Sequence, residues 1–482
     1  MELTIRSLAT RGVGFGTSGV RATVDALTDD VCYAYAAAFL QVLGRRGPVR
    51  RVAIGHDLRP SSPRITAACV AACRDAGAEV VHCGALPTPA LAHHAMGLGV
   101  PAIVVTGSHI PFDRNGIKFY TPWGEILKED EAAITAATVN LPDGAFAGGR
   151  LVAPAPLPPV DASALAGYVR RYVGFVPAGI LRGRRIGLYE HSSVARDVLK
   201  EILAALGAEV VPLGRTDVFV PVDTEAVSDE DEQKARAWVA EHRLDALVST
   251  DGDGDRPLVA DERGEFLRGD LVGLLCARFL GVRTLVTPVS SNTAVERCGA
   301  FPKVVRTRIG SPYVIAGMSA PGAEAPVGGY EANGGFLLGS DVARGGAHLA
   351  ALPTRDAALP IVALLGAAAE RGQPLSALRA DVPPRFTSSD RIAAFETARS
   401  QRLVSRLAAD AAALRGFFAP LGAPASVDQT DGLRVTLASG EIVHLRPSGN
   451  APELRCYAEA DSPARARELA AWGLKAARAG AE

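Results

Sequence analysis

The most constraining feature of the sequence is a pattern that occurs three times, in which short apolar runs alternate with alanine-rich stretches of helical character. This alternation predicts βα units that build mostly parallel sheets. We expect strands at residues 51–54, 79–83, 102–106, 185–189, 209–213, 246–250, 284–288 and 303–307 and around residue 327, with a helix over 65–76. From about residue 380 the pattern predicts antiparallel strands at 433–437, 442–446 and 454–458 with a turn at 439–440, and then a helix from residue 464.

The chain of 482 residues is too long for one compact core, so several domains are expected. A proline-rich stretch at 153–160 predicts a stiff linker and a domain boundary. The predicted fold class is α/β, with three α/β domains of mixed, mostly parallel sheets and a smaller C-terminal α+β domain around a central cleft. We place these domains at residues 1–152, 160–262, 263–375 and 376–482.

Composition excludes several classes of protein. The 51 basic and 52 acidic residues nearly cancel, which argues against binding to nucleic acid or to an anionic membrane. The seven cysteines are scattered and contain no CxxC pair, so they are expected to be reduced packing residues. The sequence has neither a leader-like apolar segment at its start nor an apolar run long enough to span a bilayer. We therefore expect a soluble cytoplasmic protein, and no protein partner is predicted.

An acidic loop with three aspartates at a spacing of two, Asp251, Asp253 and Asp255, follows an expected strand. Magnesium takes few protein carboxylates and completes its octahedron with water or with phosphate oxygens, so this loop predicts a Mg²⁺ site. A calcium EF-hand loop is an alternative, because Glu262 lies at its twelfth position. Arg256 stands where that loop needs glycine, which argues against calcium. A solvated turn is the other alternative.

A second loop contains Ser108 and His109 within residues 106–111, followed by Lys118 at the end of residues 115–118. A serine just beyond a strand can be an exposed nucleophile when a base or a metal activates it. Lysine can act as that base where arginine cannot. Only six of the 51 basic residues are lysine, which makes Lys118 more informative. The alternative is a turn that happens to contain a polar serine.

A third loop, at residues 446–455, combines a glycine turn with hydroxyl, amide and guanidinium groups. Backbone amides and arginines together form sites for a phosphate dianion. An ordinary surface loop is the alternative. The candidate phosphate-binding residues are Arg446, Ser448, Gly449, Asn450 and Arg455.

A literal GxGxxG occurs at residues 14–19, but no apolar strand precedes it and no complete βαβ unit surrounds it. It is therefore a poor dinucleotide-binding motif. With Arg21 just after it, the segment is better interpreted as an arm that places a cation near a substrate phosphate.

Taken together and in order, these motifs resemble those of the α-D-phosphohexomutase family, which includes bacterial phosphomannomutases and phosphoglucomutases. The resemblance extends over the whole chain. It rests on the N-terminal motif at residues 15–21, the phosphoserine loop at 106–111 with 115–118, the magnesium loop at 251–256 and the phosphate-binding loop at 446–455.

The resemblance implies a phosphohexomutase that interconverts hexose 1-phosphate and hexose 6-phosphate. A phosphoryl group on Ser108 would pass to the sugar, and the hexose 1,6-bisphosphate would turn and return its other phosphoryl group. Mg²⁺ would be held by Ser108 and the three aspartates. Arg21, His109 and Arg256 would stabilise the transition state and Lys118 would act as base. Small sugar phosphates are the expected partners, and hinge motion is expected near residues 370–385.

Departures from the family pattern concern the sugar more than the chemistry. Ile110 stands where the family usually has asparagine, and Gly107 where alanine is common. The sugar-recognition loop keeps Glu331 but has Asn333 in place of the usual serine. Arg308 stands where many relatives have lysine or histidine, and a phosphate or sugar contact is assigned to it. Mannose phosphate is the first choice of substrate, ahead of glucose phosphate and then glucosamine phosphate.

Two other functions remain open from the sequence. A phosphatase would use the same serine and metal, but it has no need for the second phosphate-binding loop. A non-catalytic sugar-phosphate binder has no need to retain the serine, the lysine and all three aspartates.

Overall fold

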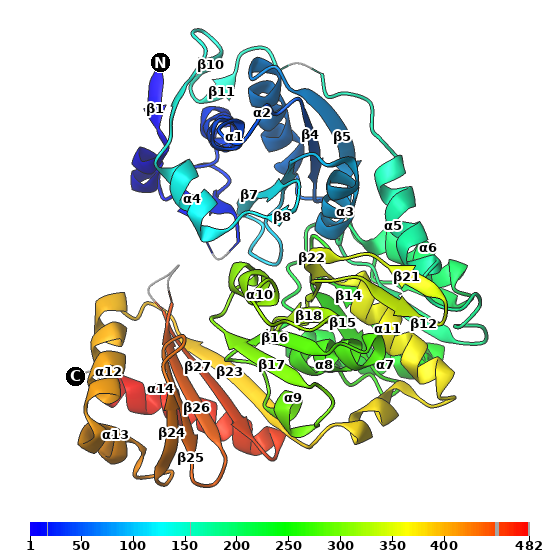
Figure 1. Cartoon of the computed structure of the whole chain (residues 1–482), viewed down its shortest axis with the longest axis vertical. Coiled ribbons are helices and arrows are strands. Elements are labelled where there is room, and N and C mark those ends of the chain that lie inside the picture. Colours follow the sequence, from blue (N-terminus) through cyan, green and yellow to red (C-terminus); the bar gives the residue numbers. More distant parts are fainter. Residues whose placement is uncertain (17, 155, 449–452, 481–482) are drawn as a thin grey trace.

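The computed structural model describes residues 1–16, 18–154, 156–448 and 453–480. Figure 1 shows four layered units along the chain: the first in blue and cyan, two central ones in green and yellow, and the last in orange and red. The first three units contain mixed sheets and the last contains an antiparallel sheet, as the sequence predicts.

The first unit contains a seven-stranded sheet of order β2-β3-β7-β6-β4-β5, with β8 paired to β7. Its strands are β2 (Gly14–Phe15), β3 (Val20–Thr23), β4 (Arg51–His56), β5 (Glu79–Ala85), β6 (Ala102–Val105), β7 (Arg114–Thr121) and β8 (Gly124–Glu125). Its helices are η1 (Ile5–Arg11), α1 (Asp29–Gly44), α2 (Ser62–Asp75), α3 (Thr88–Leu98) and α4 (Lys128–Thr135). Two small antiparallel pairs are β1 (Glu2–Thr4) with β9 (Thr138–Asn140) and β10 (Phe146–Ala147) with β11 (Arg150–Leu151).

The second unit has a four-stranded sheet of order β13-β12-β14-β15. Its elements are α5 (Ser163–Val173), β12 (Arg185–Tyr189), α6 (Arg196–Ala205), β13 (Glu209–Leu213), α7 (Asp229–His242), β14 (Ala246–Thr250) and β15 (Pro257–Ala260).

The third unit has a five-stranded sheet of order β17-β16-β18-β19-β22. Its strands are β16 (Thr284–Pro288), β17 (Lys303–Thr307), β18 (Val327–Tyr330), β19 (Phe336–Leu338) and β22 (Leu352–Asp356), with a hairpin of β20 (Val342–Arg344) and β21 (Ala347–Leu349). Its helices are α8 (Gly269–Leu280), α9 (Ala294–Arg297), α10 (Ser311–Met318) and α11 (Ala358–Glu370).

The last unit has an antiparallel sheet of order β23-β27-β26-β25-β24. Its elements are β23 (Phe386–Ile392), α12 (Thr397–Ala409), α13 (Ala411–Phe418), β24 (Pro424–Asp428), β25 (Leu433–Leu437), β26 (Ile442–Pro447), β27 (Leu454–Ala460) and α14 (Pro463–Gly480), and η2 (Leu375–Asp381) precedes it.

The three predicted functional loops share one construction. In each of the first three sheets, a buried strand is followed by a loop and then by an antiparallel strand that returns beside it. These pairs are β6 with β7, β14 with β15, and β18 with β19. Ser108, Asp251 and Glu331 therefore all follow the carboxyl ends of buried strands, where ligands gather in open α/β sheets.

The distribution of apolar cores separates the last unit from the others. One continuous core includes side chains of all three α/β units, such as Leu91, Tyr168 and Ile361, whereas the last unit packs around its own core. Polar contacts join the third and last units: the backbone N–H of Thr293 donates to Glu459 Oε2 at 3.0 Å, and the backbone N–H of Ile309 donates to Asp431 Oδ2 at 2.9 Å. A separate core with a polar joint favours motion of the last unit as one body. The hinge at residues 370–385 stays a prediction.

Among the helices that the structure describes, none combines the length and the apolar character needed to cross a bilayer.

Candidate active site

Ser108 lies in the loop between β6 and β7 and has a left-handed φ of 52°. Such a φ costs a residue other than glycine about 1–3 kcal/mol, so the surrounding structure must hold it. The backbone N–H of Ser108 donates to Thr106 Oγ1 at 2.8 Å. The buried Ser108 hydroxyl donates to Asp251 Oδ2 at 2.6 Å. The predicted nucleophile and the acidic loop therefore meet, although they belong to different units.

Two residues that sequence analysis missed, Asp57 and Arg59, hold this loop from the end of β4. The buried Arg59 guanidinium donates to four loop carbonyl oxygens at 2.5–3.0 Å, those of Ser108, Ile110, Pro111 and Arg114. Asp57 Oδ2 accepts from the backbone N–H of Gly107 at 3.1 Å. A Cβ on Gly107 would lie 2.3 Å from Arg59 Cζ, so glycine at this departure from the family pattern leaves room for the arginine.

Changing Arg59 to methionine is expected to lower kcat by about a hundredfold with a smaller change in KM, because a nucleophile misplaced by about 1 Å loses about that much rate. Steady-state kinetics, with thermal unfolding to verify folding, measures this. Arg74→Met is the matched control, since Arg74 also donates to a carbonyl oxygen, that of Pro156, at an exposed position. A folded Arg59→Met variant with wild-type kcat would show that the Ser108 loop keeps its conformation without Arg59.

The acidic loop between β14 and β15 brings three buried carboxylates together. One oxygen from each of Asp251, Asp253 and Asp255 lies within 4.8 Å of the other two. Burial and the two neighbouring carboxylates raise the pKa of Asp251 well above its usual value. Burial opposes ionisation of Asp255 too, but Arg355, Lys118 and Arg256 outweigh it and hold the pKa of that carboxyl below its usual value.

This donor set fits a hard divalent cation. The Oδ1 atoms of Asp253 and Asp255 are buried and accept no hydrogen bond, although Arg256 Nε lies 3.6 Å from the second of them. Buried carboxylate oxygens without donors are costly unless a cation faces them. The structure weakens the calcium alternative, which needs Glu262 as the ligand at the twelfth loop position. The Glu262 carboxylate instead accepts a hydrogen bond from the backbone N–H of Ser376 at 3.1 Å.

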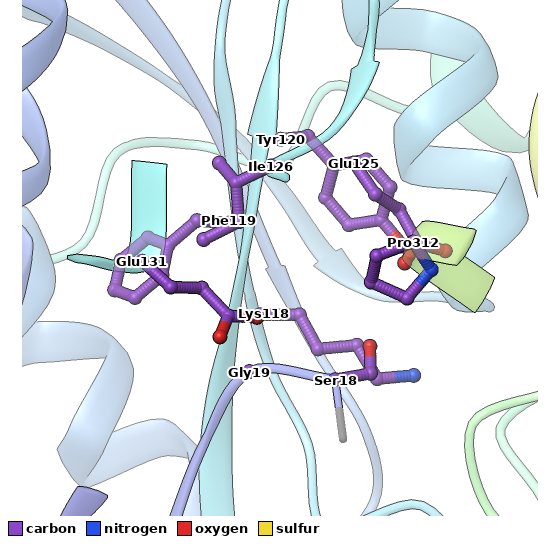
Figure 2. Close-up of a pocket in the computed structure, with 9 residues that line it drawn as sticks. All are labelled: Ser18, Gly19, Lys118, Phe119, Tyr120, Glu125, Ile126, Glu131 and Pro312. Atoms are coloured by element: carbon purple, nitrogen blue, oxygen red, sulfur yellow. The ribbon is translucent and has the colours of Figure 1, made fainter. Parts of the chain in front are cut away.

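Lys118, on β7, lies directly against this loop. Its Nζ is 2.6 Å from Asp253 Oδ2 and 2.7 Å from Asp255 Oδ2, and its side chain is buried. Figure 2 shows the side chain running past Gly19 to a point beside Ser18. Gly19 has a φ of 77°, and a Cβ there would lie 3.1 Å from Lys118 Cγ, so glycine permits the N-terminal hairpin to pack against the lysine. The small pocket around Lys118 is also lined by Phe119, Tyr120, Glu125, Ile126, Glu131 and Pro312.

His109 lies between Ser108 and Arg256. Its Nδ1 is 3.3 Å from Ser108 Oγ and its Nε2 is 3.5 Å from Arg256 Nη1. The charge of Arg256, followed by burial, lowers the pKa of His109 to about 2. The ring is therefore neutral at physiological pH. Because Arg256 has only donors, Nε2 is assigned as the acceptor and Nδ1 carries the proton toward Ser108.

Arg21, on β3, contacts the backbone just before Ser108. Its Nη1 donates to the carbonyl oxygen of Thr106, and a Cβ on Gly116 would lie only 2.1 Å from this nitrogen. Burial lowers the pKa of Arg21 to about 10, so the side chain stays protonated at neutral pH. The predicted cation therefore contacts the backbone two residues before the predicted nucleophile.

The sugar-recognition loop reaches the same cluster through a residue that sequence analysis missed. Arg355, on β22, donates to Glu331 Oε2 at 2.7 Å and to Asp255 Oδ2 at 2.9 Å. Asn333 contacts its own loop, since its side-chain oxygen accepts a hydrogen bond from the backbone N–H of Gly335 at 3.0 Å. A charged residue in the short strand β22 was the available sequence signal.

The remaining predicted residues lie on the third and last units. Arg308 is exposed, with its guanidinium 5.2 Å from the centre of the Tyr313 ring. Arg446 Nε donates to Asp431 Oδ2 at 2.9 Å. Ser448 is buried, and its backbone N–H donates to the carbonyl oxygen of Glu453 at 2.9 Å. Arg455 Nη2 lies 3.4 Å from Glu453 Oε2. The predicted phosphate contacts Gly449 and Asn450 lie outside the described residues.

A serine and a lysine of the first unit therefore meet an aspartate triad of the second, within a fold of three α/β units and a separate C-terminal unit. Comparison with known families identifies the class of protein. Models of the phosphoglucomutase/phosphomannomutase α/β/α domains I, II and III match residues 12–142, 166–264 and 268–386, and that of the C-terminal domain matches 394–472. The chain belongs to the phosphoglucomutase/phosphomannomutase family and is a phosphohexomutase, an isomerase.

Relatives cover the chain almost from end to end. It is 49% identical to a phosphomannomutase of Sinorhizobium fredii, over 96% of this chain and 98% of the relative. It is 46% identical to a phosphomannomutase of Salmonella muenchen, over 94% and 92%. A phosphoglucosamine mutase of Gluconacetobacter diazotrophicus is 31% identical over 95% and 96%.

Solved structures show the same fold at lower identity. A phosphoglucomutase/phosphomannomutase family protein of Burkholderia thailandensis superposes with a TM-score of 0.75 at 22% identity, covering 97% of this chain and 98% of that one. The N-acetylphosphoglucosamine mutase of Aspergillus fumigatus, in complex with GlcNAc-6P and magnesium, has a TM-score of 0.57 at 14% identity and covers 99% of both chains.

Proposed function

We propose that the enzyme interconverts mannose 1-phosphate and mannose 6-phosphate through a phosphoryl group on Ser108 and a bound hexose 1,6-bisphosphate. The observation that carries this proposal is the 2.6 Å hydrogen bond from Ser108 Oγ to Asp251 Oδ2, inside a buried triad that also contacts Lys118. Mannose is favoured because the two relatives named phosphomannomutase are 49% and 46% identical, against 31% for the phosphoglucosamine mutase.

The proposed metal is Mg²⁺. Its proposed ligands are Asp251, Asp253 and Asp255, together with the phosphorylated Ser108. When bound, Mg²⁺ supplies positive charge that polarises the phosphoryl oxygens. Arg21 and Arg256 add fixed positive charge to the same site, where charge neutralisation and in-line positioning matter most.

In the first transfer, the bond between Ser108 Oγ and phosphorus breaks as the free sugar hydroxyl forms its own bond to phosphorus. Lys118, acting as a neutral amine, takes the hydroxyl proton and passes it to Ser108 Oγ, which regains its hydroxyl as it leaves and accepts a hydrogen bond from the Nδ1–H of His109. After the bisphosphate turns, its other phosphoryl group moves to Ser108 Oγ, and Lys118 takes the serine proton and passes it to the leaving sugar oxygen. Each cycle therefore restores both residues.

The distal phosphate is assigned to the last unit and the sugar hydroxyls to the third. Glu331 is a suitable acceptor for hydroxyl groups, because Arg355 fixes one of its oxygens. Residues proposed for these contacts are Arg308, Glu331, Asn333, Arg446, Ser448, Gly449, Asn450 and Arg455.

Initial rates on mannose 1-phosphate, glucose 1-phosphate and glucosamine 1-phosphate, with Mg²⁺ and a trace of hexose 1,6-bisphosphate, test the proposal. We expect conversion to the 6-phosphate with the highest kcat/KM on mannose 1-phosphate. Faster conversion of glucosamine 1-phosphate would reassign the sugar. Release of inorganic phosphate without a 6-phosphate product would favour a phosphatase.

Changing Lys118 to arginine is expected to lower kcat by about two to four orders of magnitude, the usual contribution of a general base, because arginine stays protonated and cannot take the hydroxyl proton. Steady-state kinetics on the best sugar measures this. Lys234→Met is the control, since Lys234 pairs with Glu230 at 2.7 Å on α7, away from the triad. A Lys118→Arg variant with near wild-type kcat would remove the lysine from the proton-transfer role.

A further inference from the structure

Arg355 connects two loops that belong to different units. Its side chain is 3% exposed. Nη1 donates to Glu331 Oε2 at 2.7 Å, whereas Nε and Nη2 donate to Asp255 Oδ2 at 3.1 and 2.9 Å. One rigid guanidinium group therefore holds a carboxylate of the acidic loop and a carboxylate of the sugar-recognition loop at the same time.

The surrounding structure fixes the strand that carries this arginine. Thr354 Oγ1 donates to Glu125 Oε1 at 2.7 Å, and Asp356 Oδ1 accepts from Tyr168 Oη at 2.6 Å. A Cβ on Gly335 would lie 2.8 Å from Arg355 Cδ and 2.9 Å from the carbonyl oxygen of Asp255, so glycine there permits the close approach. Because both neighbours of Arg355 are bonded to other units, its side chain has little freedom to move away from either carboxylate.

The two carboxylate oxygens of Asp255 have different partners. Asp255 Oδ2 accepts from both Arg355 and Lys118, whereas Asp255 Oδ1 has no hydrogen bond and is left for a cation. A shift of Glu331 on binding a sugar would be transmitted to Asp255 through a planar group that does not bend.

We propose that Arg355 is a positioning residue that couples the two loops, so that a sugar phosphate at Glu331 tightens the binding of a divalent cation at Asp255, and the reverse. This inference rests on the proposed function for the identity of both ligands. By linkage, the two affinities change by the same factor, and couplings of this kind are typically about 5- to 150-fold.

The test measures metal affinity rather than turnover. Mn²⁺ binding to the unphosphorylated protein is followed by electron paramagnetic resonance, with and without saturating mannose 6-phosphate. We expect the sugar phosphate to tighten Mn²⁺ binding at least about fivefold in the wild-type protein. In Arg355→Met the factor is expected to fall to about one, with Mn²⁺ still bound by the triad. Glu331→Gln is expected to remove the same coupling. The double variant Arg355→Met/Glu331→Gln is expected to have the same coupling factor as either single variant.

Arg344→Met is the matched control. Arg344 lies in the same unit and pairs with Glu370 at 2.6 Å, and its loss is expected to leave the coupling factor unchanged. Arg355→Lys keeps the charge but cannot hold both carboxylates, so we expect an intermediate coupling factor. If Arg355→Met does not fold, Arg355→Lys provides the test in its place. A folded Arg355 variant with the wild-type factor overturns the inference. Failure of the proposed function would appear separately, as wild-type protein that converts none of the sugars.

Discussion

Alanine in place of Ser108 is expected to lower mutase turnover by at least about four orders of magnitude, because removing a nucleophile leaves only the binding and electrostatic contributions. Ser108 Oγ is the hydroxyl that donates to Asp251 Oδ2 at 2.6 Å, at the point where Lys118 and the triad meet. Initial rates with Mg²⁺ and a trace of hexose 1,6-bisphosphate measure the loss.

The matched control is Ser400→Ala. Ser400 is also buried, but its hydroxyl donates to the carbonyl oxygen of Thr397 at 2.8 Å within the last unit. We expect its turnover to stay within about a factor of two of wild type and its stability to fall by about 1 kcal/mol, the usual net value of one hydrogen bond. A Ser108→Ala variant that keeps substantial turnover would remove the nucleophile from this account.

The second large effect concerns the metal. Changing Asp253 to asparagine is expected to weaken Mg²⁺ binding and to lower turnover by about a thousandfold, which corresponds to about 4 kcal/mol of transition-state stabilisation. The change removes the charge of a carboxylate whose Oδ1 has no hydrogen-bond donor. A chelator is expected to stop the wild-type reaction, and added Mg²⁺ to restore it. Metal titrations of activity measure both effects.

Asp245→Asn serves as the control for this variant. Asp245 lies just before β14, and its carboxylate accepts from the backbone N–H of Arg185 at 2.7 Å, away from the triad. Its Mg²⁺ dependence is expected to match that of the wild type. Full activity of the wild-type protein in the presence of a chelator would contradict a role for the triad in binding a catalytic metal.

Most of the strands could be predicted because they are short apolar runs, several of them buried. The predictions at 185–189, 209–213 and 246–250 coincide with β12, β13 and β14. The antiparallel strands predicted at 433–437, 442–446 and 454–458 match β25, β26 and β27, whereas the antiparallel strands β7 and β22 were not predicted. The strand β7 contains Asn115, Gly116 and Lys118, and β22 contains Arg355, so their polar residues interrupt the apolar pattern. Those polar residues belong to or border the candidate site, so the apolar pattern does not predict a strand there.

The candidate site could be predicted where chemistry is concentrated in one stretch of sequence. The aspartate triad occupies five residues, and Ser108 and His109 are adjacent. Arg59 and Arg355 could not be found in this way, because the first acts on a loop about 50 residues later and the second on Asp255, 100 residues earlier. Arginine is also the common cation of this chain, so neither residue stands out by type.

The measurement that tests the central claim most directly is the transfer of phosphorus from labelled hexose 1,6-bisphosphate to the protein, with the labelled residue located by peptide mass spectrometry. We predict label on Ser108, dependence on Mg²⁺, and passage of the label to the sugar when unlabelled mannose 1-phosphate is added. Label on another residue, or its release as inorganic phosphate without passage to a sugar, would contradict a mutase that works through Ser108.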